Sequence, residues 1–428
     1  MWVGIDDTDS LHGGCTTYIA TEIVKEICNA GYDIIGYPRL VRLNPNIPWK
    51  TRGNGAIALQ IGVGGGKREL IGEIEEKVYG CAYKKRDARA DEIISILDKI
   101  MKNAEGGANP AWVVTEKKFS RKLYSKAVKE IVSVKEVKRT LAETRAKWKT
   151  YRKEIGLIGA SAAIAWKPLN RTYELLTYTH GEKFVEKESV IKMDSLFPFT
   201  FNNYDYENDY IALLPHSPSP VFYGIRGGDV GELKKAMEML ETSEVERWII
   251  YETNQATDEH LQRKKIEKVK PYESVIVKGK VEKEPFTIEG GHVIFSISNG
   301  AEIDCAAYEP TKGFRNIIKE LKKGDEVVVY GGVRAKPFTI NIEKIEVKKL
   351  VDVYKKVENP ICKKCKKHMK SIGKGKGYKC PKCGAKAGEN EAKYVKIERK
   401  IKTGFYEVPV IARRHLAKPL GDRVIYQL

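Results

Sequence analysis

The sequence predicts a multidomain chain with an N-terminal α/β unit, a small β-barrel of the OB type and a C-terminal zinc ribbon. Length is the first reason, because 428 residues exceed one compact core and suggest three or four domains. The second is a strand, an acidic loop and a helix within the first 31 residues, and the third is a paired cysteine motif beyond residue 360. A hydrophobic content of 42% excludes general disorder.

The N-terminal unit begins with residues 2–5, an apolar run typical of a short buried strand. Isoleucine and alanine then recur at helical spacing from residue 19 to about residue 30. The loop between the two elements holds the side chains that suggest chemistry: Asp6, Asp7, Asp9, Gly13, Gly14, Thr16 and Thr17.

This loop is typical of a site for a nucleoside triphosphate. Free backbone N–H groups and the positive end of the helix favour an anion. Clustered carboxylates suit Mg²⁺, which prefers one or two carboxylates together with phosphate oxygens. The Walker pattern GxxxxGK[ST] does not occur here. The alternative is a structural turn, in which the acids only end the strand and Thr16 only caps the helix.

Residues 271–347 predict a small barrel. Five short β-rich runs are separated by glycine or proline: 274–281, 293–297, 301–306, 327–333 and 338–347. A helical stretch at 315–323 lies between the third and fourth runs, which is the order of the OB fold, and that fold commonly binds single-stranded nucleic acid. Four aromatic residues are candidates either for stacking on bases or for ordinary core and rim positions: Phe286, Phe295, Tyr308 and Phe338.

Four of the eight cysteines form two CxxC pairs separated by 14 residues: Cys362, Cys365, Cys380 and Cys383. Two such knuckles bring four thiolates to one tetrahedral Zn²⁺, and a site filled by four protein ligands is structural rather than catalytic. Six lysines lie between the two pairs and would present their charge to phosphates. The other four cysteines are scattered singly, as reduced cysteines are in an intracellular protein.

Charge indicates a polyanionic partner. The chain has 76 lysine and arginine residues against 57 aspartate and glutamate residues, a formal net charge of +19. Residues 351–428 hold 21 of the basic and 7 of the acidic residues, an excess of 14. This concentration beside the cysteine motif favours nucleic acid over a merely solvated surface.

The sequence predicts no membrane-spanning segment and no signal peptide. The longer uncharged stretches, 53–66, 155–166 and 210–225, are shorter than the roughly 20 apolar residues that span a bilayer. The first residues reach an aspartate at once and lack a basic start followed by an apolar segment. We therefore expect a cytoplasmic protein with no membrane partner.

Several motifs together resemble one family along the whole chain. The run from Gly4 to Ser10, with Gly14-Cys15-Thr16-Thr17, closely resembles the start of the archaeal tRNA(Ile) 2-agmatinylcytidine synthetases, the TiaS family. Ala256 departs from the family pattern, which has a glycine there. Further runs resemble later segments of the family: 44–48, 51–56, 107–110, 156–160, 200–205, 223–227 and 252–255.

The resemblance implies a tRNA-modifying ligase. Such enzymes use ATP to activate the wobble cytidine of the CAU-anticodon isoleucine tRNA and then replace its 2-oxo group with agmatine, while ATP ends as AMP and phosphate. The product, agmatidine, lets the tRNA read AUA. The family combines an ATP-using domain, a ferredoxin-like α+β domain, an OB domain and a zinc ribbon. It phosphorylates a threonine that matches Thr16.

Candidate site residues follow from this resemblance. Asp6, Asp7, Asp9 and Thr16 are the expected catalytic residues, and the three aspartates would hold Mg²⁺. The residues expected to bind ATP are Gly13, Gly14, Thr16, Thr17, Lys50, Arg52 and Asn54. Lys50 and Arg52 are alternatively ordinary surface bases.

Agmatine carries a guanidinium and an amine, so its pocket needs hydrogen-bond acceptors and carboxylates. We expect Asn202, Asn203 and Asp205 to bind it, the alternative being that this segment is only a turn. The sequence does not identify the base that deprotonates the attacking amine.

We expect four units, with a basic and largely helical segment at 116–152 and a lysine-rich linker at 262–270. In the second unit, 160–166 and 172–177 predict buried strands and 231–240 predicts a helix. The units are an ATP domain at 1–137, a ferredoxin-like domain at 138–268, an OB domain at 271–350, and a zinc ribbon with a basic C-terminal region at 351–428.

Two other functions fit parts of the sequence. A non-catalytic nucleic-acid-binding protein would use the OB barrel and the zinc ribbon, but this function leaves the first 260 or so residues unexplained. A Mg²⁺-dependent phosphoesterase or nuclease would use the same three aspartates and would cleave nucleic acid without ATP.

Overall fold

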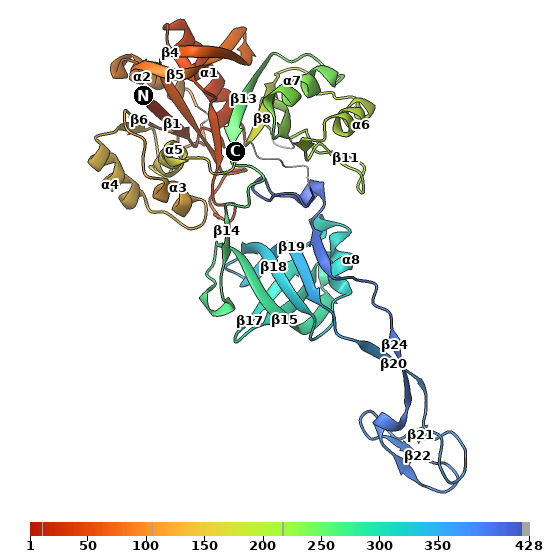
Figure 1. Cartoon of the computed structure of the whole chain (residues 1–428). Helices are drawn as coiled ribbons and strands as arrows, with labels where there is room; N and C mark the ends of the chain where they lie inside the picture. Colours follow the sequence, from red (N-terminus) through yellow and green to blue (C-terminus); the bar gives the residue numbers. More distant parts are fainter. Residues whose placement is uncertain (11, 105, 216–217, 422–428) are drawn as a thin grey trace.

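The computed structural model describes residues 1–10, 12–104, 106–215 and 218–421. The chain forms a large α/β body, a β-barrel beside it and a small cysteine-rich unit at the far end of a two-stranded arm (Figure 1). The prediction of a multidomain chain with mixed α/β structure, a closed five-stranded barrel and a C-terminal zinc ribbon is confirmed.

One mixed sheet of eleven strands runs through the α/β body in the order β7-β6-β1-β4-β3-β13-β8-β12-β9, with β2 and β5 paired beside β4. Strand β13 pairs with β3 and β4 on one side and with β8 on the other, so the two N-terminal units share one sheet. The strands are β1 (Trp2–Asp6), β2 (Asp33–Ile35), β3 (Arg39–Arg42), β4 (Gly55–Ile74), β5 (Glu76–Asp87), β6 (Ala111–Thr115), β7 (Lys147–Thr150), β8 (Thr172–Tyr178), β9 (Thr200–Phe201), β12 (Val221–Gly227) and β13 (Arg247–Thr253).

Helices cover both faces of this sheet (Figure 1). Alternate residues of a strand point to opposite faces, so Val3 and Ile5 of β1 share a core with α1 and α2, while Trp2 packs with α3, α4 and α5. Helices α6 and α7 pack on β8 and β12. The helices are α1 (Thr16–Asn29), α2 (Ala90–Met101), α3 (Arg121–Ala127), α4 (Val134–Thr144), α5 (Gly156–Ala165), α6 (Lys187–Leu196) and α7 (Val230–Met239).

Helix α5 shows that the prediction of a buried strand at 160–166 was wrong. The run is apolar throughout, and such a pattern does not separate a buried helix from a buried strand. Its glycine, alanine and serine residues allow the helix to lie directly on β1, since a Cβ at Gly4 would be only 2.2 Å from the carbonyl oxygen of Ala160. Strand β8 and helix α7 confirm the other two elements predicted in this unit.

The basic segment 116–152 contains α3 and α4 and ends in β7, so it is helical over much of its length. Helix α4 runs across the expected division between the first two units at residue 137. A short hairpin of β10 (Tyr204–Asp205) and β11 (Tyr210–Ile211) lies apart from the large sheet.

The barrel closes because β15 pairs with both β16 and β18, while β17 and β19 complete the circle. As predicted, α8 (Phe314–Lys319) lies between the third and fourth barrel strands. Phe295 is fully buried in the core, so it is not a base-stacking residue, whereas Phe286 and Phe338 are exposed. The strands are β15 (Ser274–Thr287), β16 (Val293–Ser298), β17 (Glu302–Ala307), β18 (Glu326–Val333) and β19 (Thr339–Lys349).

The segment 262–270, expected to be a linker, is instead part of the barrel. Strand β14 (Leu261–Arg263) pairs in parallel with β15. Ile266 and Val269 enter the barrel core, because these two apolar side chains interrupt the run of lysines.

Strands β20 (Val353–Glu358) and β24 (Lys393–Ile397) form the arm that carries the cysteine-rich unit away from the barrel (Figure 1). That unit contains β21 (Lys370–Ser371), β22 (Tyr378–Lys379) and β23 (Lys386–Ala387). The Sγ atoms of Cys362, Cys365, Cys380 and Cys383 all lie within 4.8 Å of one another, so these four thiols fit a single tetrahedral Zn²⁺.

Residues 402–421, which we call the C-terminal tail, return from the arm to the α/β body. Strand β25 (Gly404–Glu407) pairs with β19, and Leu416 packs in the core formed by α3, α4 and α5. The amide of Ala256 donates to the carbonyl oxygen of His415 at 2.8 Å, and that of Asp258 donates to Leu416 at 2.9 Å. Ala256 has a φ of 56°, a left-handed conformation that glycine adopts at least cost.

No helix among the described residues is long and apolar enough to cross a membrane.

Glu343 of β19 fastens the tail to the rest of the molecule. One carboxylate oxygen lies 3.0 Å from Nε2 of His260, and the other lies 3.2 Å from Arg414 of the tail. Burial alone would raise the pKa of Glu343, but the charges of His260 and Arg414 outweigh it and hold the pKa near 2, below the ordinary value of 4.5.

A depressed carboxyl pKa contributes stability that is present above pH 4.5 and is lost as the pH falls towards 2. Glu343→Gln should therefore lower the free energy of unfolding at pH 7 by about 2–3 kcal/mol, and the variant should lose less stability than the parent between pH 4.5 and 2. Urea unfolding at a series of pH values measures both. Glu284→Gln, which breaks an exposed pair with Lys322, is the control and should change stability little. Equal pH dependence in the parent and Glu343→Gln would contradict this assignment.

Candidate active site

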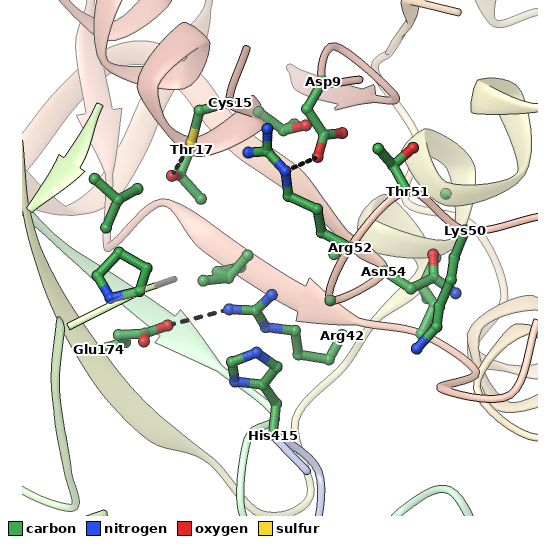
Figure 2. Close-up of a pocket in the computed structure, with 18 of the residues that line it drawn as sticks. Asp9, Cys15, Thr17, Arg42, Lys50, Thr51, Arg52, Asn54, Glu174 and His415 are labelled. Atoms are coloured by element: carbon green, nitrogen blue, oxygen red, sulfur yellow. Dashed lines mark hydrogen bonds and ion pairs between the residues drawn. The ribbon is translucent and has the colours of Figure 1, made fainter. Parts of the chain in front are cut away.

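A cavity of about 560 Å³ lies where the first loop, the β3–β4 loop, helix α5, the β8–β12 part of the sheet and the C-terminal tail meet (Figure 2). It brings together most of the residues expected to act in the site. The expected residues that line it are Asp6, Asp7, Asp9, Thr16, Thr17, Lys50, Arg52, Asn54 and Asn202.

Asp6 and Asp7 reach the cavity because strand β1 ends between them. Asp7 has a φ of 57°, and its carbonyl oxygen accepts a hydrogen bond from the amide of Asn109 at 3.0 Å. Helix α5 leaves room for Asp6 only because it has a glycine there: a Cβ at Gly159 would lie 1.8 Å from Oδ2 of Asp6. The turn is therefore held from two sides.

Burial raises the pKa of all three carboxyl groups. For Asp6 the pKa is well above the ordinary value, chiefly through burial and then through the charge of Asp7. Burial raises the pKa of Asp7 to about 6, and it raises that of Asp9 although the nearby Arg52 acts in the opposite direction. Three buried carboxyl groups with so little compensating positive charge favour the binding of a cation.

Helix α1 begins at the cavity. Its N-cap is Cys15, whose side chain makes no capping hydrogen bond, so the alternative that Thr16 caps the helix is wrong. Thr16 is only 7% exposed and its hydroxyl accepts a hydrogen bond from Thr8 at 3.1 Å. The first N–H groups of a helix have no carbonyl partner within it, so this end of the cavity suits an anion.

Arg52 holds the first loop together. Its guanidinium donates to the carbonyl oxygens of Ser10, Gly13 and Gly14, each at 3.0 Å, and lies 3.7 Å from the carboxylate of Asp9. The two glycines thus sit behind the cavity wall. Since its donors are used by the protein, Arg52 shapes the loop in addition to lending its charge to the cavity.

Lys50 and Asn54 come from the β3–β4 loop. Burial and the nearby Arg414 lower the pKa of Lys50. Asn54 has a φ of 48°, and its side-chain amide donates to the carbonyl oxygen of Asn44 at 2.8 Å, which closes the loop on itself. Lys50 is therefore the cation of this loop that faces the cavity, while Asn54 fixes the loop that presents it.

The segment 202–205 is divided. Asn202 lines the cavity and accepts a hydrogen bond from Arg413 of the tail. Asn203 is buried and donates to Asp194 at 2.9 Å and to Thr200 at 2.7 Å. Asp205 is also buried and accepts the amide of Ile411 in the tail at 3.0 Å. Two of the three residues expected to bind agmatine therefore have partners away from the cavity.

A buried group of charges that sequence reasoning missed forms the wall opposite α1. Glu174 of β8 is 1% exposed and lies 2.7 Å from Arg226 and 3.5 Å from Arg42. Burial would raise the pKa of Glu174, but the two arginines outweigh it and lower the pKa below its ordinary value. A single glutamate in the apolar run of 172–178 was the available signal, because a buried charge needs a partner.

The tail supplies the last wall, with Val410, Ile411, Arg413 and His415 lining the cavity. Figure 2 shows the ring of His415 pointing up towards Arg42 and Glu174. Sequence reasoning noticed the run Arg413-Arg414-His415 only as part of a basic tail, since nothing local indicates that residue 415 lies beside the first loop.

Three family models match the chain: the TiaS TCKD domain over residues 2–153, the TiaS FLD domain over 154–260 and the TiaS C-terminal zinc ribbon domain over 359–401. The chain is 43% identical to the 2-agmatinylcytidine synthetase TiaS, specific for an isoleucine tRNA, of Methanocaldococcus jannaschii, with 98% of each protein covered.

Solved structures agree with the sequence comparison. The fold is similar to that of TiaS in complex with its isoleucine tRNA and ATP, with a TM-score of 0.83 and 39% identity. It is also similar to that of TiaS in complex with the same tRNA, AMPCPP and agmatine, with a TM-score of 0.80 and 36% identity. In both comparisons 98% of this chain and 96% of the other chain are covered. The resemblance first read from the Asp6–Thr17 loop thus extends over the whole protein, and the chain belongs to the TiaS family.

Proposed function

We propose that this protein is an ATP-dependent ligase that joins agmatine to C2 of the wobble cytidine in the CAU-anticodon isoleucine tRNA, forming agmatidine. The observation that carries the proposal is one cavity with an acidic loop, a helix start and a cationic wall, in a chain 43% identical to a curated 2-agmatinylcytidine synthetase of isoleucine tRNA. A tRNA substrate agrees with the cytoplasmic location expected from the sequence.

The chemistry explains why such a cavity is needed. The 2-oxo group of cytidine is a very poor leaving group, so an amine does not displace it directly. Transfer of a phosphoryl group from ATP to that oxygen converts it into a leaving phosphate. The agmatine nitrogen then bonds to C2, the C2–O bond breaks, and the amine gives up a proton.

Asp6, Asp7 and Asp9 are proposed to lie against the phosphates of ATP and to share one Mg²⁺. The raised pKa values of these buried carboxyl groups fit such a cation, and one or two of the carboxylates with phosphate oxygens would suffice. Mg²⁺, when bound, neutralises negative charge on the transferring phosphates. Because the first turn of α1 faces the same cavity, Thr16 and Thr17 would offer N–H and hydroxyl groups to ATP.

The other proposed ATP contacts have support of differing kinds. Lys50 faces the cavity directly. Arg52, Gly13, Gly14 and Asn54 act through the shape of the two loops, because their polar groups already bond within the protein.

For agmatine, Asn202 is the proposed contact because it lines the cavity. Asn203 and Asp205 would hold the segment that presents it, since both are buried and bonded to neighbouring elements.

The barrel, the arm and the zinc ribbon are proposed to bind the body of the tRNA. Residues 351–428 carry the excess of 14 positive charges, and the arm extends them far from the cavity (Figure 1). A non-catalytic nucleic-acid-binding protein and a nuclease are not favoured, because the family match includes the N-terminal catalytic half of the chain.

The direct test is mass analysis of nucleosides from the isoleucine tRNA after incubation with the protein, ATP and agmatine. We expect a cytidine that has gained agmatine and lost the 2-oxo oxygen, with AMP formed in parallel. A CAU-anticodon methionine tRNA is the control substrate and should stay unmodified. Cleaved tRNA, or product formed without ATP, would overturn the proposal.

Thr16 is proposed as the residue that ATP phosphorylates. Thr16→Val keeps the shape and removes the hydroxyl, so self-phosphorylation and agmatidine formation should both be lost. The buried hydroxyl of Thr8 loses its partner, which costs about 1–3 kcal/mol of stability. Phosphoprotein analysis and thermal melting measure these effects. Thr17→Val is the matched control: near-parental product from Thr16→Val, or loss of phosphorylation only in Thr17→Val, would show that Thr16 is not the acceptor.

The four cysteines are proposed to hold a structural Zn²⁺ that tRNA binding requires. Changing both Cys380 and Cys383 to serine should release one zinc per chain and lower tRNA affinity at least about tenfold, because the lysines between the knuckles lose their platform. Agmatine binding should hardly change. Metal analysis and filter binding measure the two effects, with the isolated Cys28→Ser as control. Parental tRNA affinity after confirmed zinc loss would contradict the proposal.

A further inference from the structure

His415 reaches the reaction cavity from the far end of the chain, and its place there is rigidly built. Its carbonyl oxygen accepts the amide of Ala256 at 2.8 Å, and the carbonyl oxygen of the following Leu416 accepts the amide of Asp258 at 2.9 Å. The carboxylate of Asp258 in turn accepts the amide of Lys418 at 2.7 Å. Anchors on both sides of residue 415 keep its ring in the cavity wall.

The ring lies between the β3–β4 loop and the buried arginines. A Cβ at Gly53 would lie 3.2 Å from Nε2 of His415 and 2.7 Å from Nη1 of Arg42, so a glycine at position 53 lets both groups approach the loop. Within the part of the chain that the structure describes, the ring nitrogens of His415 make no hydrogen bond to protein. The imidazole therefore presents an uncommitted nitrogen near the cavity.

The surroundings keep this imidazole neutral. Burial lowers the pKa of His415 well below its ordinary value of 6.5, and the charges of Arg42, Arg226 and Lys50 act in the same direction. The other charged group on this wall, Glu174, is already paired with both arginines. Near neutral pH, His415 is thus a proton acceptor rather than a cation.

The segment proposed to bind agmatine adjoins His415. Asn202 accepts a hydrogen bond from Arg413, two residues before His415 in the tail. The cations beside His415 also disfavour an ammonium ion, so an amine at this wall would lose its proton more readily than in water. A proton acceptor and conditions that favour a free amine coincide at one wall.

We propose, on the basis of the function proposed above, that His415 is the base that takes the proton from agmatine when its amine attacks the activated cytidine. The agmatine nitrogen bonds to C2 as the C2–O bond breaks and phosphate leaves. The proton released by the nitrogen passes to the free ring nitrogen of His415. Phosphoryl transfer from ATP comes earlier and makes no use of this histidine.

The test separates the two steps in single-turnover reactions with the isoleucine tRNA. His415→Ala should slow agmatidine formation about 100-fold or more, whereas phosphate transfer from ATP measured without agmatine should stay within about threefold of the parent. His415→Gln, which keeps a polar side chain of similar reach, should behave in the same way and guards against misfolding of the alanine variant. Added imidazole should restore part of the lost rate in His415→Ala.

His180→Ala is the matched control, since this histidine lies on the same α/β body, is exposed and pairs with Glu246. It should keep the parental rate of both steps. Parental agmatidine formation by His415→Ala, an equal loss of phosphate transfer, or no recovery with imidazole would each overturn the assignment. Absence of agmatidine from the parent protein would overturn the proposed function, and this proposal with it.

Discussion

Direct contact between the backbones of strand β1 and helix α5 is the constraint on which the cavity depends. The two elements approach so closely that Gly4 and Gly159 have no room for a side chain, the first against the Ala160 carbonyl and the second against the Asp6 carboxyl group. This contact sets where β1 ends and therefore where Asp6 and Asp7 point. A core of ordinary leucines would hold the helix farther from the sheet and fill the space that the carboxyl groups use.

The cavity brings opposite charges to separate walls. The aspartates lie beside the start of α1, whereas Arg42, Arg226 and Lys50 lie on the other side, near the tail. Burying Glu174 with Arg42 and Arg226 is costly, and well-packed apolar residues would fill the same volume at less expense. The arginines are retained where they can meet the phosphates and hold neighbouring groups neutral, which suggests that reactivity outweighs stability at this wall.

Local patterns made much of the fold predictable. Paired cysteines, five short β-rich runs and a loop between a strand and a helix each carry a signature within 30 to 80 residues. Helix α5 was missed because an all-apolar run has no period to read, and Ile266 was hidden among lysines. In the site, the first loop was found from its aspartates, but Asn203 and Asp205 belong to residue types that also favour turns. Arg42, Glu174 and His415 meet only through long-range folding, and a sequence does not show such contacts locally.

The path of the tail has a consequence for the life of the protein in the cell. The segment that closes the cavity follows the zinc ribbon in the chain and is made after it. A nascent chain released early would hold the whole α/β body and even the barrel, yet its cavity would lack a wall. Synthesis therefore delivers the completed reaction chamber only after every tRNA-binding module has emerged from the ribosome, which limits premature use of ATP by incomplete chains.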